Sequence, residues 1–265
     1  MDKYTFRGFF WKRLLGGHFL NLYRKHRKYV TEEIEGSALT FNLDTEIGLK
    51  LYLEGGFEKK EMEICRKYIK EDSVVLDIGA NVGIHSVYFS RMAGKGLVFA
   101  FEPSPETFAL LSKNVGKIEN VIPVNIGMSD AKKVAVFFIA SDDAYSGLKD
   151  TRRKDIKKRV KVACLAVDDF FRGLDLKNVD FVKIDVEGFE QSVLEGMRWL
   201  IEKYKPVIFC EIYKGTDSNE DPERTVRHLI DKGYEALVFD GEKLVNFKRH
   251  DDRFYNYFFL PRTGK

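Results

Sequence analysis

A single stretch decides the fold of this chain: Val74-Val75-Leu76-Asp77-Ile78-Gly79-Ala80-Asn81-Val82-Gly83. Its apolar, β-branched start predicts a buried strand, and residues 84–92 then predict a helix. The glycines between them allow a sharp turn and a close approach of the backbone to a ligand. A strand, a glycine turn and a helix N-terminus present free N–H groups, which predicts a nucleotide site in a doubly wound fold.

The spacing of the glycines indicates which nucleotide binds. The dinucleotide fingerprint G-x-G-x-x-G seats a pyrophosphate on the helix end, whereas here Asn81 stands where the second glycine would be. The carboxylate of Asp77 leads into the turn, and an anion there suits a cation better than a pyrophosphate. S-adenosylmethionine carries an ammonium, a sulfonium and a carboxylate but no phosphate. Asp77 can face its ammonium while the loop amides face its carboxylate.

A second acidic residue supports this interpretation. The apolar run 97–101 ends in Glu102, the position of an acid that accepts hydrogen bonds from both ribose hydroxyls. Either acid alone could be an ordinary strand-end residue. The two together, in register on consecutive strands, favour a site for a methyl donor.

The length and composition of the chain are those expected of one large α/β domain with additional segments. The chain has 265 residues, of which 44% are hydrophobic and 32% charged, and its net charge of +3 gives no reason to expect nucleic acid as a partner. The three cysteines are far apart and show neither a disulfide framework nor metal-ligand spacing. No run approaches the ~20 apolar residues that span a bilayer. We therefore expect a cytoplasmic enzyme.

From residue 71 to the end, strand and helix patterns alternate, which predicts a mostly parallel sheet with helices on both faces. The predicted strands are 74–76, 97–101, 121–126, 181–184 and 207–211, and the predicted helices are 84–92, 105–115 and 189–204. Two further strands, 134–140 and 160–165, interrupt this order before the fourth core strand. Residues 235–239 and 257–260 predict a closing antiparallel pair, with Asp240-Gly241 as a turn signal.

Two segments precede this core domain of residues 71–265. Residues 34–70 contain an alternating pattern over 38–53, which predicts a hairpin, and a helical stripe over 57–69. Residues 1–33 interleave aromatic and basic side chains and predict two short helices divided by Gly16-Gly17. Such an extension can pack on its own domain or on a second subunit, or contact an anionic membrane surface as a peripheral protein. Packing is the favoured interpretation, and a homo-oligomer is compatible with it.

Acidic residues at the strand ends are the candidates for chemistry. Asp185 ends the fourth core strand and Glu187 follows it, so both should lie where ligands bind in open α/β sheets. Transfer of a methyl group to an alcohol needs positioning and a base, for which these two residues are the best candidates. His85 is a third, although a histidine in this position is more often structural. With Glu211 the two acids could alternatively bind Mg²⁺, which is the less favoured case.

Two further segments are candidates for ligand contacts. The exit of the third strand, with Asp130 and the backbone of Met128, can accept a hydrogen bond from the adenine amine, or can form an ordinary turn. Residues 149–161 carry eight lysines and arginines. A charged run is usually a solvated surface, but this one interrupts the core beside the acceptor side. It can therefore be a loop that binds an anionic acceptor.

These motifs resemble the FkbM family of class I S-adenosylmethionine-dependent methyltransferases over roughly residues 47–261. The resemblance depends on Glu58, on 75–83, on Phe101-Glu102-Pro103 and on Lys183-Ile184-Asp185-Val186-Glu187-Gly188-Phe189-Glu190 followed by 193–196. It implies a seven-stranded sheet with an antiparallel final strand and O-methylation of a hydroxyl, often on a sugar or polyketide. It also implies a substrate-binding role for Ser146. At position 127 this chain has glycine, where relatives more often have a different small residue.

The sequence thus predicts an S-adenosylmethionine-dependent O-methyltransferase acting on a hydroxyl of a sugar, glycan or related metabolite. The predicted donor-binding residues are Asp77, Gly79, Ala80, Asn81, Gly83, Glu102, Pro103 and Asp130. Asp185 and Glu187 are the predicted catalytic residues, and Ser146, His85 and Glu211 the predicted acceptor contacts. One alternative is a catalytically silent fold that binds a membrane surface or a partner through residues 1–33. The other is an RNA methyltransferase, against which the modest net charge argues.

Overall fold

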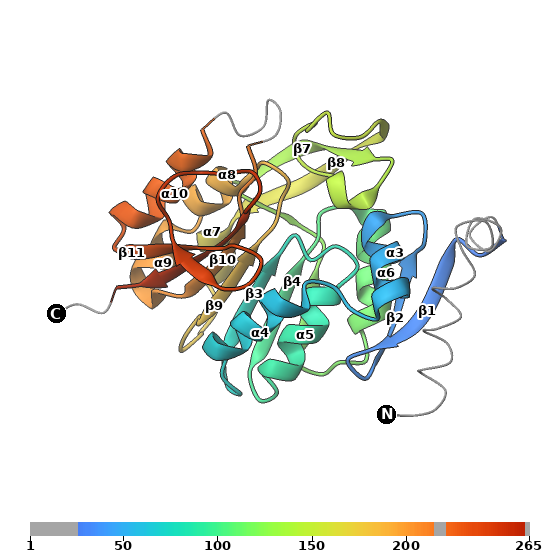
Figure 1. Cartoon of the computed structure of the whole chain (residues 1–265), viewed down its shortest axis with the longest axis horizontal. Helices are drawn as coiled ribbons and strands as arrows, with labels where there is room; N and C mark the ends of the chain where they lie inside the picture. Colours follow the sequence, from blue (N-terminus) through green and yellow to red (C-terminus); the bar gives the residue numbers. More distant parts are fainter. Residues whose placement is uncertain (1–25, 215–220, 263–265) are drawn as a thin grey trace.

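An eight-stranded sheet forms the centre of the molecule (Figure 1). The structure, a computed structural model, describes residues 26–214 and 221–262. Across the sheet the strands are β12 (Leu244–Asn246), β11 (Tyr234–Phe239), β13 (Asn256–Pro261), β10 (Val207–Glu211), β9 (Phe181–Ile184), β3 (Val74–Ile78), β4 (Leu97–Phe101) and β5 (Val121–Val124). Strands β5, β4, β3, β9 and β10 run parallel, and β13 runs antiparallel to both β10 and β11.

Helices cover both faces of this sheet, because alternate residues of the central strands point to opposite sides. Val75 of β3 packs into one buried cluster, and Val74 and Leu76 pack into the other. The first face carries α4 (Lys59–Tyr68), α5 (Ile84–Met92) and α6 (Pro105–Val115). The second face carries α7 (Val167–Phe171), α8 (Glu190–Glu195), α9 (Arg198–Tyr204) and α10 (Pro222–Asp231).

The predicted doubly wound fold is therefore confirmed, including the antiparallel final strand β13. The short strand β12 adds an eighth member at the edge. The turn signal Asp240-Gly241 joins β11 to β12 and not to β13, since Asp240 accepts hydrogen bonds from the backbone of residues 242 and 243. The pairing of β11 with β13 itself is as predicted.

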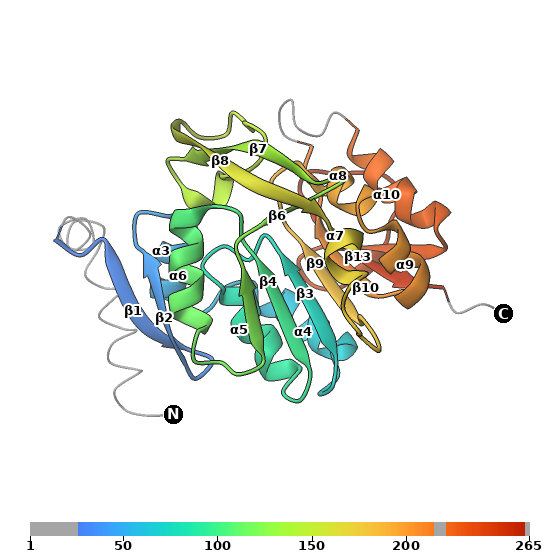
Figure 2. The same ribbon diagram turned by 180° about the vertical axis from the view of Figure 1, so that it is seen from behind.

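A second, three-stranded sheet lies beside the upper end of the main sheet (Figure 2). Its strands, in order, are β6 (Gly127–Ser129), β8 (Ile156–Ala166) and β7 (Lys133–Ala140). The antiparallel pairing of β7 with β8 confirms the extra pair predicted from the sequence. The loop that joins them contains the short 3₁₀ turn η1 (Asp143–Tyr145).

The hairpin predicted over 38–53 is wrong. The hairpin is instead β1 (Tyr29–Ile34) with β2 (Ser37–Asn42), and α3 (Glu46–Glu54) follows. The side chain of Thr45 accepts a hydrogen bond from the backbone of Gly48 and begins the helix, and Gly55, with a φ of 64°, ends it. The final residues of the predicted helical extension 1–33 therefore lie in a strand, while residues 1–25 lie outside the described residues.

The single helix predicted over 189–204 is divided into α8 and α9. The division falls at Gly196 and Met197, where a Cβ at Gly196 would lie 1.8 Å from the backbone oxygen of Ser129 and the backbone of Met197 leaves the helical conformation. The side chain of Asp168 caps the start of α9, because its carboxylate accepts hydrogen bonds from the backbone of residues 199 and 200 at 2.9 and 3.0 Å. Within residues 26–214 and 221–262, none of the helices combines the length and apolarity required to cross a membrane.

Candidate active site

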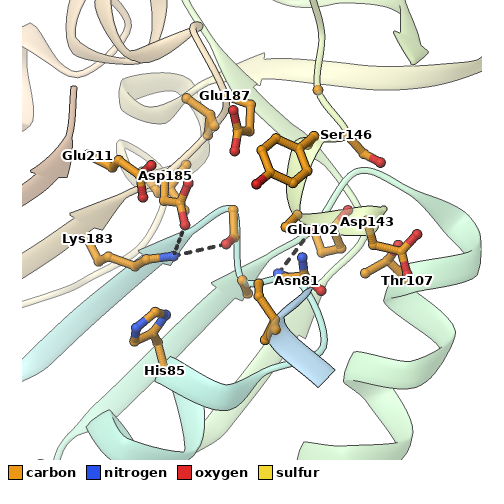
Figure 3. Close-up of a pocket in the computed structure, with 18 of the residues that line it drawn as sticks. Asn81, His85, Glu102, Thr107, Asp143, Ser146, Lys183, Asp185, Glu187 and Glu211 are labelled. Atoms are coloured by element: carbon orange, nitrogen blue, oxygen red, sulfur yellow. Dashed lines mark hydrogen bonds and ion pairs between the residues drawn. The ribbon is translucent and has the colours of Figure 1, made fainter. Parts of the chain in front are cut away.

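A cavity of about 390 Å³ opens at the carboxyl ends of β3, β4, β9 and β10 (Figure 3). Of the residues predicted for the site, its lining includes Gly79, Ala80, Asn81, His85, Glu102, Pro103, Ser146, Asp185, Glu187 and Glu211. The structure thus brings together the two halves of the predicted site, which are far apart in the sequence. A cavity of this size, with a few converging polar groups, is typical of a small-molecule site.

The glycine turn forms one wall of the cavity. Gly79 has a φ of 81°, and a Cβ there would lie 1.8 Å from the backbone oxygen of Asp185. Only glycine fits this contact without strain, so the turn after β3 rests directly on the turn after β9. Gly83 serves helix packing instead. A Cβ there would lie 2.7 Å from Leu111, so this glycine allows α5 to pack on α6, and it does not line the cavity.

Asn81 and Glu102 are linked directly. The carboxylate of Glu102 accepts hydrogen bonds from the backbone of Asn81 at 3.1 Å and of Ser104 at 2.8 Å (Figure 3). Burial raises the pKa of Glu102 to about 7. Each oxygen uses one lone pair for these contacts and keeps another for a ligand. Glu102 can therefore accept hydrogen bonds from two neighbouring hydroxyls, as predicted for a ribose.

Asp77 lies beneath the cavity and does not line it. Its carboxylate is fully buried, accepts a hydrogen bond from Ser86 at 2.6 Å and lies 3.4 Å from Nζ of Lys183. Lys183 also lies 3.3 Å from Asp185 and donates to the backbone oxygen of Gly79 (Figure 3). This buried lysine therefore joins the donor loop to the acceptor side. Direct contact of Asp77 with the donor's ammonium stays a prediction.

Three carboxyl groups gather at the acceptor side. One oxygen from each of Asp185, Glu187 and Glu211 lies within 4.8 Å of the other two. Burial, followed by the charge of Asp185, raises the pKa of Glu187 to about 8 and holds that of Glu211 well above its usual range. Acids that hold protons near neutral pH are suited to proton transfer. A divalent metal ion here stays a prediction, because carboxylates share strand ends in many such folds without one.

The backbone of Glu187 is also unusual. Its φ of 51° lies in the left-handed region, and Gly188 follows with a φ of 88°. A non-glycine residue in this conformation costs free energy, and such strain often occurs at active sites. Figure 3 shows the side chain of Glu187 turned toward the interior of the cavity.

The remaining predicted residues differ in how directly they face the cavity. His85 is buried and its Nε2 lies 2.9 Å from the carboxylate of Glu58, so part of its role is structural. The hydroxyl of Ser146 accepts a hydrogen bond from the backbone of Ala140 while the residue lines the cavity. Asp130 lies outside the lining, where Lys133, Ser129 and Ser192 surround it and hold its pKa well below the usual range. Its contact with adenine stays a prediction.

Sequence reasoning missed several residues that line the cavity. Lys183 was noted only as part of the family resemblance, although it stands two residues before Asp185 and opposite Asp77 in the sheet register. Arg153 was one of eight basic residues in 149–161, with nothing in the sequence to distinguish it. Tyr213 and Tyr255 also line the cavity, and no sequence pattern indicates them.

Comparison with known proteins agrees with this geometry. The family model described as "Methyltransferase FkbM domain" matches residues 77–236, which is more than half of the chain. The chain belongs to the FkbM methyltransferase family. As an FkbM methyltransferase it is an enzyme of the class predicted from Asp77-Ile78-Gly79 and Asp185-Val186-Glu187-Gly188.

Two relatives of this FkbM methyltransferase are named for what they methylate, a hexuronic acid in one case and an oxygen at position 2 in the other. Hexuronic acid methyltransferase AglP from Haloferax volcanii is 30% identical over 228 residues, covering 85% of this chain and 91% of that protein. The 2-O-methyltransferase NoeI from Sinorhizobium fredii is 24% identical over 180 residues, covering 59% of this chain and 72% of that protein. The crystal structure of methyltransferase FkbM from Methylobacillus flagellatus aligns with a TM-score of 0.47 at 16% identity, covering 72% of this chain and 44% of that one.

Proposed function

We propose that this FkbM methyltransferase transfers a methyl group from S-adenosylmethionine to a hydroxyl group of a sugar or glycan. One observation carries the proposal: a single cavity joins the glycine turn and Glu102 on one side to Asp185, Glu187 and Glu211 on the other. The name of AglP supports a sugar as the acceptor, and the name of NoeI supports transfer to a hydroxyl oxygen.

The donor half suits S-adenosylmethionine for reasons of shape and hydrogen bonding. Glycine at position 79 leaves the wall of the cavity free of a side chain, and Glu102 has oxygen lone pairs for the ribose hydroxyls. Asn81 and Ala80 complete the turn that would hold the methionine part. When bound, the donor supplies an electrophilic methyl carbon on a positively charged sulfur.

The acceptor half supplies proton acceptors. When a hydroxyl oxygen bonds to the methyl carbon, its proton must leave, and a carboxylate oxygen of Asp185 or Glu187 can take it. Lys183 and the contact with Gly79 fix Asp185 in position, so that the distance between the base and the donor loop stays constant. Carboxylates also accept hydrogen bonds from the other hydroxyls of a sugar, which supports this class of acceptor.

Two measurements test the proposal. Calorimetry with S-adenosylhomocysteine should show binding at a single site, and a folded sample that binds none would refute donor use. A donor-consumption screen against hydroxylated sugars should then compare the wild type with Asp185→Asn, which keeps the size of the side chain but cannot act as a base. We expect the variant to lose at least about 100-fold in rate.

Equal activity of wild type and Asp185→Asn would remove Asp185 from the chemistry and leave Glu187 as the base. The product distinguishes the acceptor atom. A methyl ether of a hydroxyl survives mild alkali, whereas a methyl ester of a carboxylate is hydrolysed. An alkali-labile product would contradict transfer to a hydroxyl.

A further inference from the structure

An arginine on the acceptor side is clamped between two aromatic rings. Cζ of Arg153 lies 4.3 Å from the centre of the Tyr145 ring and 4.7 Å from the centre of the Tyr213 ring. The three residues come from η1, from the loop before β8 and from the segment after β10, and all three line the cavity. Both distances are within cation–π range, and neither contact uses the N–H groups of the guanidinium as a hydrogen bond would.

The edge of this guanidinium is only partly used. Nη1 of Arg153 donates to the carboxylate of Glu187 at 2.8 Å, which is the one hydrogen bond that Arg153 makes to a residue of the described ranges. A guanidinium has five N–H groups in a planar fork, so this contact leaves most of them for a ligand. The side chain is 26% exposed, at the wall of the cavity. A planar fork of this kind matches a carboxylate with two parallel hydrogen bonds.

The ring of Tyr145 is itself held in place. Its hydroxyl donates to the carboxylate of Glu46, the first residue of α3, at 2.7 Å. The backbone of Glu46 in turn donates to the carboxylate of Asp142 at 2.8 Å. The clamp is therefore braced against α3, which fixes the direction in which the guanidinium edge points. A fixed fork loses less entropy when it binds than a free side chain does.

The acidic residues nearby do not cancel the positive charge of the clamp. Burial raises the pKa of Glu187 to about 8 and holds that of Glu211 above its usual range, so both groups carry less negative charge than exposed carboxyl groups do. Lys183 lies 3.3 Å from Asp185 and 3.4 Å from Asp77, so it offsets part of the charge of Asp185. An anion that approaches Arg153 therefore meets little repulsion from these groups.

We propose that Arg153, held between Tyr145 and Tyr213, anchors a carboxylate group of the acceptor, so that the acceptor is an acidic sugar methylated on a hydroxyl. The inference rests on the proposed function, since it names the substrate class of the same cavity. Arg153 binds the acceptor through the carboxylate, while Asp185 and Glu187 stand at the hydroxyl.

A matched pair of probes tests this anchor. The para-nitrophenyl glucuronide carries a carboxylate where the para-nitrophenyl glucoside carries a hydroxymethyl group, and the two are otherwise identical. Calorimetry on protein saturated with S-adenosylhomocysteine should show the glucuronide bound at least about tenfold more tightly. Arg153→Gln should remove this preference, and Arg153→Lys should keep only part of it, because lysine retains the charge without the fork.

Arg159→Gln is the control. Arg159 belongs to the same basic run, but it lies over the ring of Phe138 and outside the lining of the cavity, so its loss should leave the preference intact. Equal affinity for the two probes, a preference that persists in Arg153→Gln, or no binding of the glucuronide would each overturn the anchor. Binding of S-adenosylhomocysteine is measured first in every protein. If the wild type does not bind S-adenosylhomocysteine, the proposed function is refuted. If it binds S-adenosylhomocysteine but does not prefer the glucuronide, only the anchor is refuted.

Discussion

Glu102 offers a thermodynamic test of the donor half of the site. Its side chain is 6% exposed, and burial raises its pKa from the usual 4.5 to about 7. The folded protein therefore keeps a proton on Glu102 over a range of pH in which the unfolded chain has already lost it. Because the folded state binds more protons there, its stability must fall as pH rises from about 4.5 to about 7.

The size of this effect follows from the two pKa values. Between about pH 5 and about pH 8.5, Glu102 should cost the folded state about 2.5 kcal/mol of unfolding free energy. Glu102→Gln cannot titrate and removes this contribution. Urea unfolding of the ligand-free wild type and the variant at both pH values measures it. The amide also disturbs one of the two backbone hydrogen bonds, but that cost does not depend on pH and cancels in the comparison.

Glu106→Gln is the matched control, because Glu106 is an exposed residue of α6 paired with Lys158 at the surface. It should keep the pH dependence of the wild type. If Glu102→Gln shows that same dependence, the buried carboxyl does not titrate near pH 7 and the reasoning is refuted. At about pH 8.5, where Glu102 is charged, the variant should also bind S-adenosylhomocysteine about tenfold or more weakly than the wild type, since hydrogen bonds to a charged group contribute about 1.5–3 kcal/mol each.

Three further predictions concern the backbone, a helix cap and the base. Gly79→Ala should lower stability by about 3 kcal/mol or more, whereas Gly173→Ala, with no atom within 4 Å of the new Cβ, should be nearly neutral in a thermal melt. Asp168→Ala removes the cap of α9 and should cost about 1–3 kcal/mol, measured by urea unfolding. If Glu187 is the base, the wild-type rate should rise with pH up to about 8, where the carboxyl loses its proton. Glu187→Gln should lack this rise, and a rise that persists in the variant would show that Glu187 is not the base.

The core of the fold could be predicted because its signals are local. The strand of Val74–Ile78 is a short, mostly apolar run followed by glycines, and a second apolar run, Leu97–Phe101, leads directly to Glu102. Alternation of strand and helix then leaves few arrangements of the sheet. Carboxyl ends of parallel strands meet at one edge, so Glu102 and Asp185 could be placed together from the sequence alone.

Elements that depend on caps or on distant contacts could not be predicted in the same way. Leu49, Leu51 and Leu53 fit the period of a strand, yet Thr45 and Gly55 make this segment a helix. The break between α8 and α9 falls where Gly196 approaches β6, a contact that no local pattern shows.

The same reasoning explains why the acceptor residues were incompletely identified. Arg153 differs from its basic neighbours through its contacts with Tyr213 and Glu187, which tertiary structure brings to it. Asp77 was predicted to contact the donor, and that role stays a prediction. In the folded chain Asp77 lies beside Lys183, and the sequence alone does not reveal that pairing.

Part of the cavity wall lies outside the region shared by the family. The family model covers residues 77–236, whereas Glu46, Lys50 and Phe57 on one side, and Asp252 and Tyr255 on the other, belong to flanking segments and line the same cavity. The wall of the cavity is therefore completed by segments on both sides of the region that the family model matches. A fragment limited to residues 77–236 would lack part of the wall of its own active-site cavity.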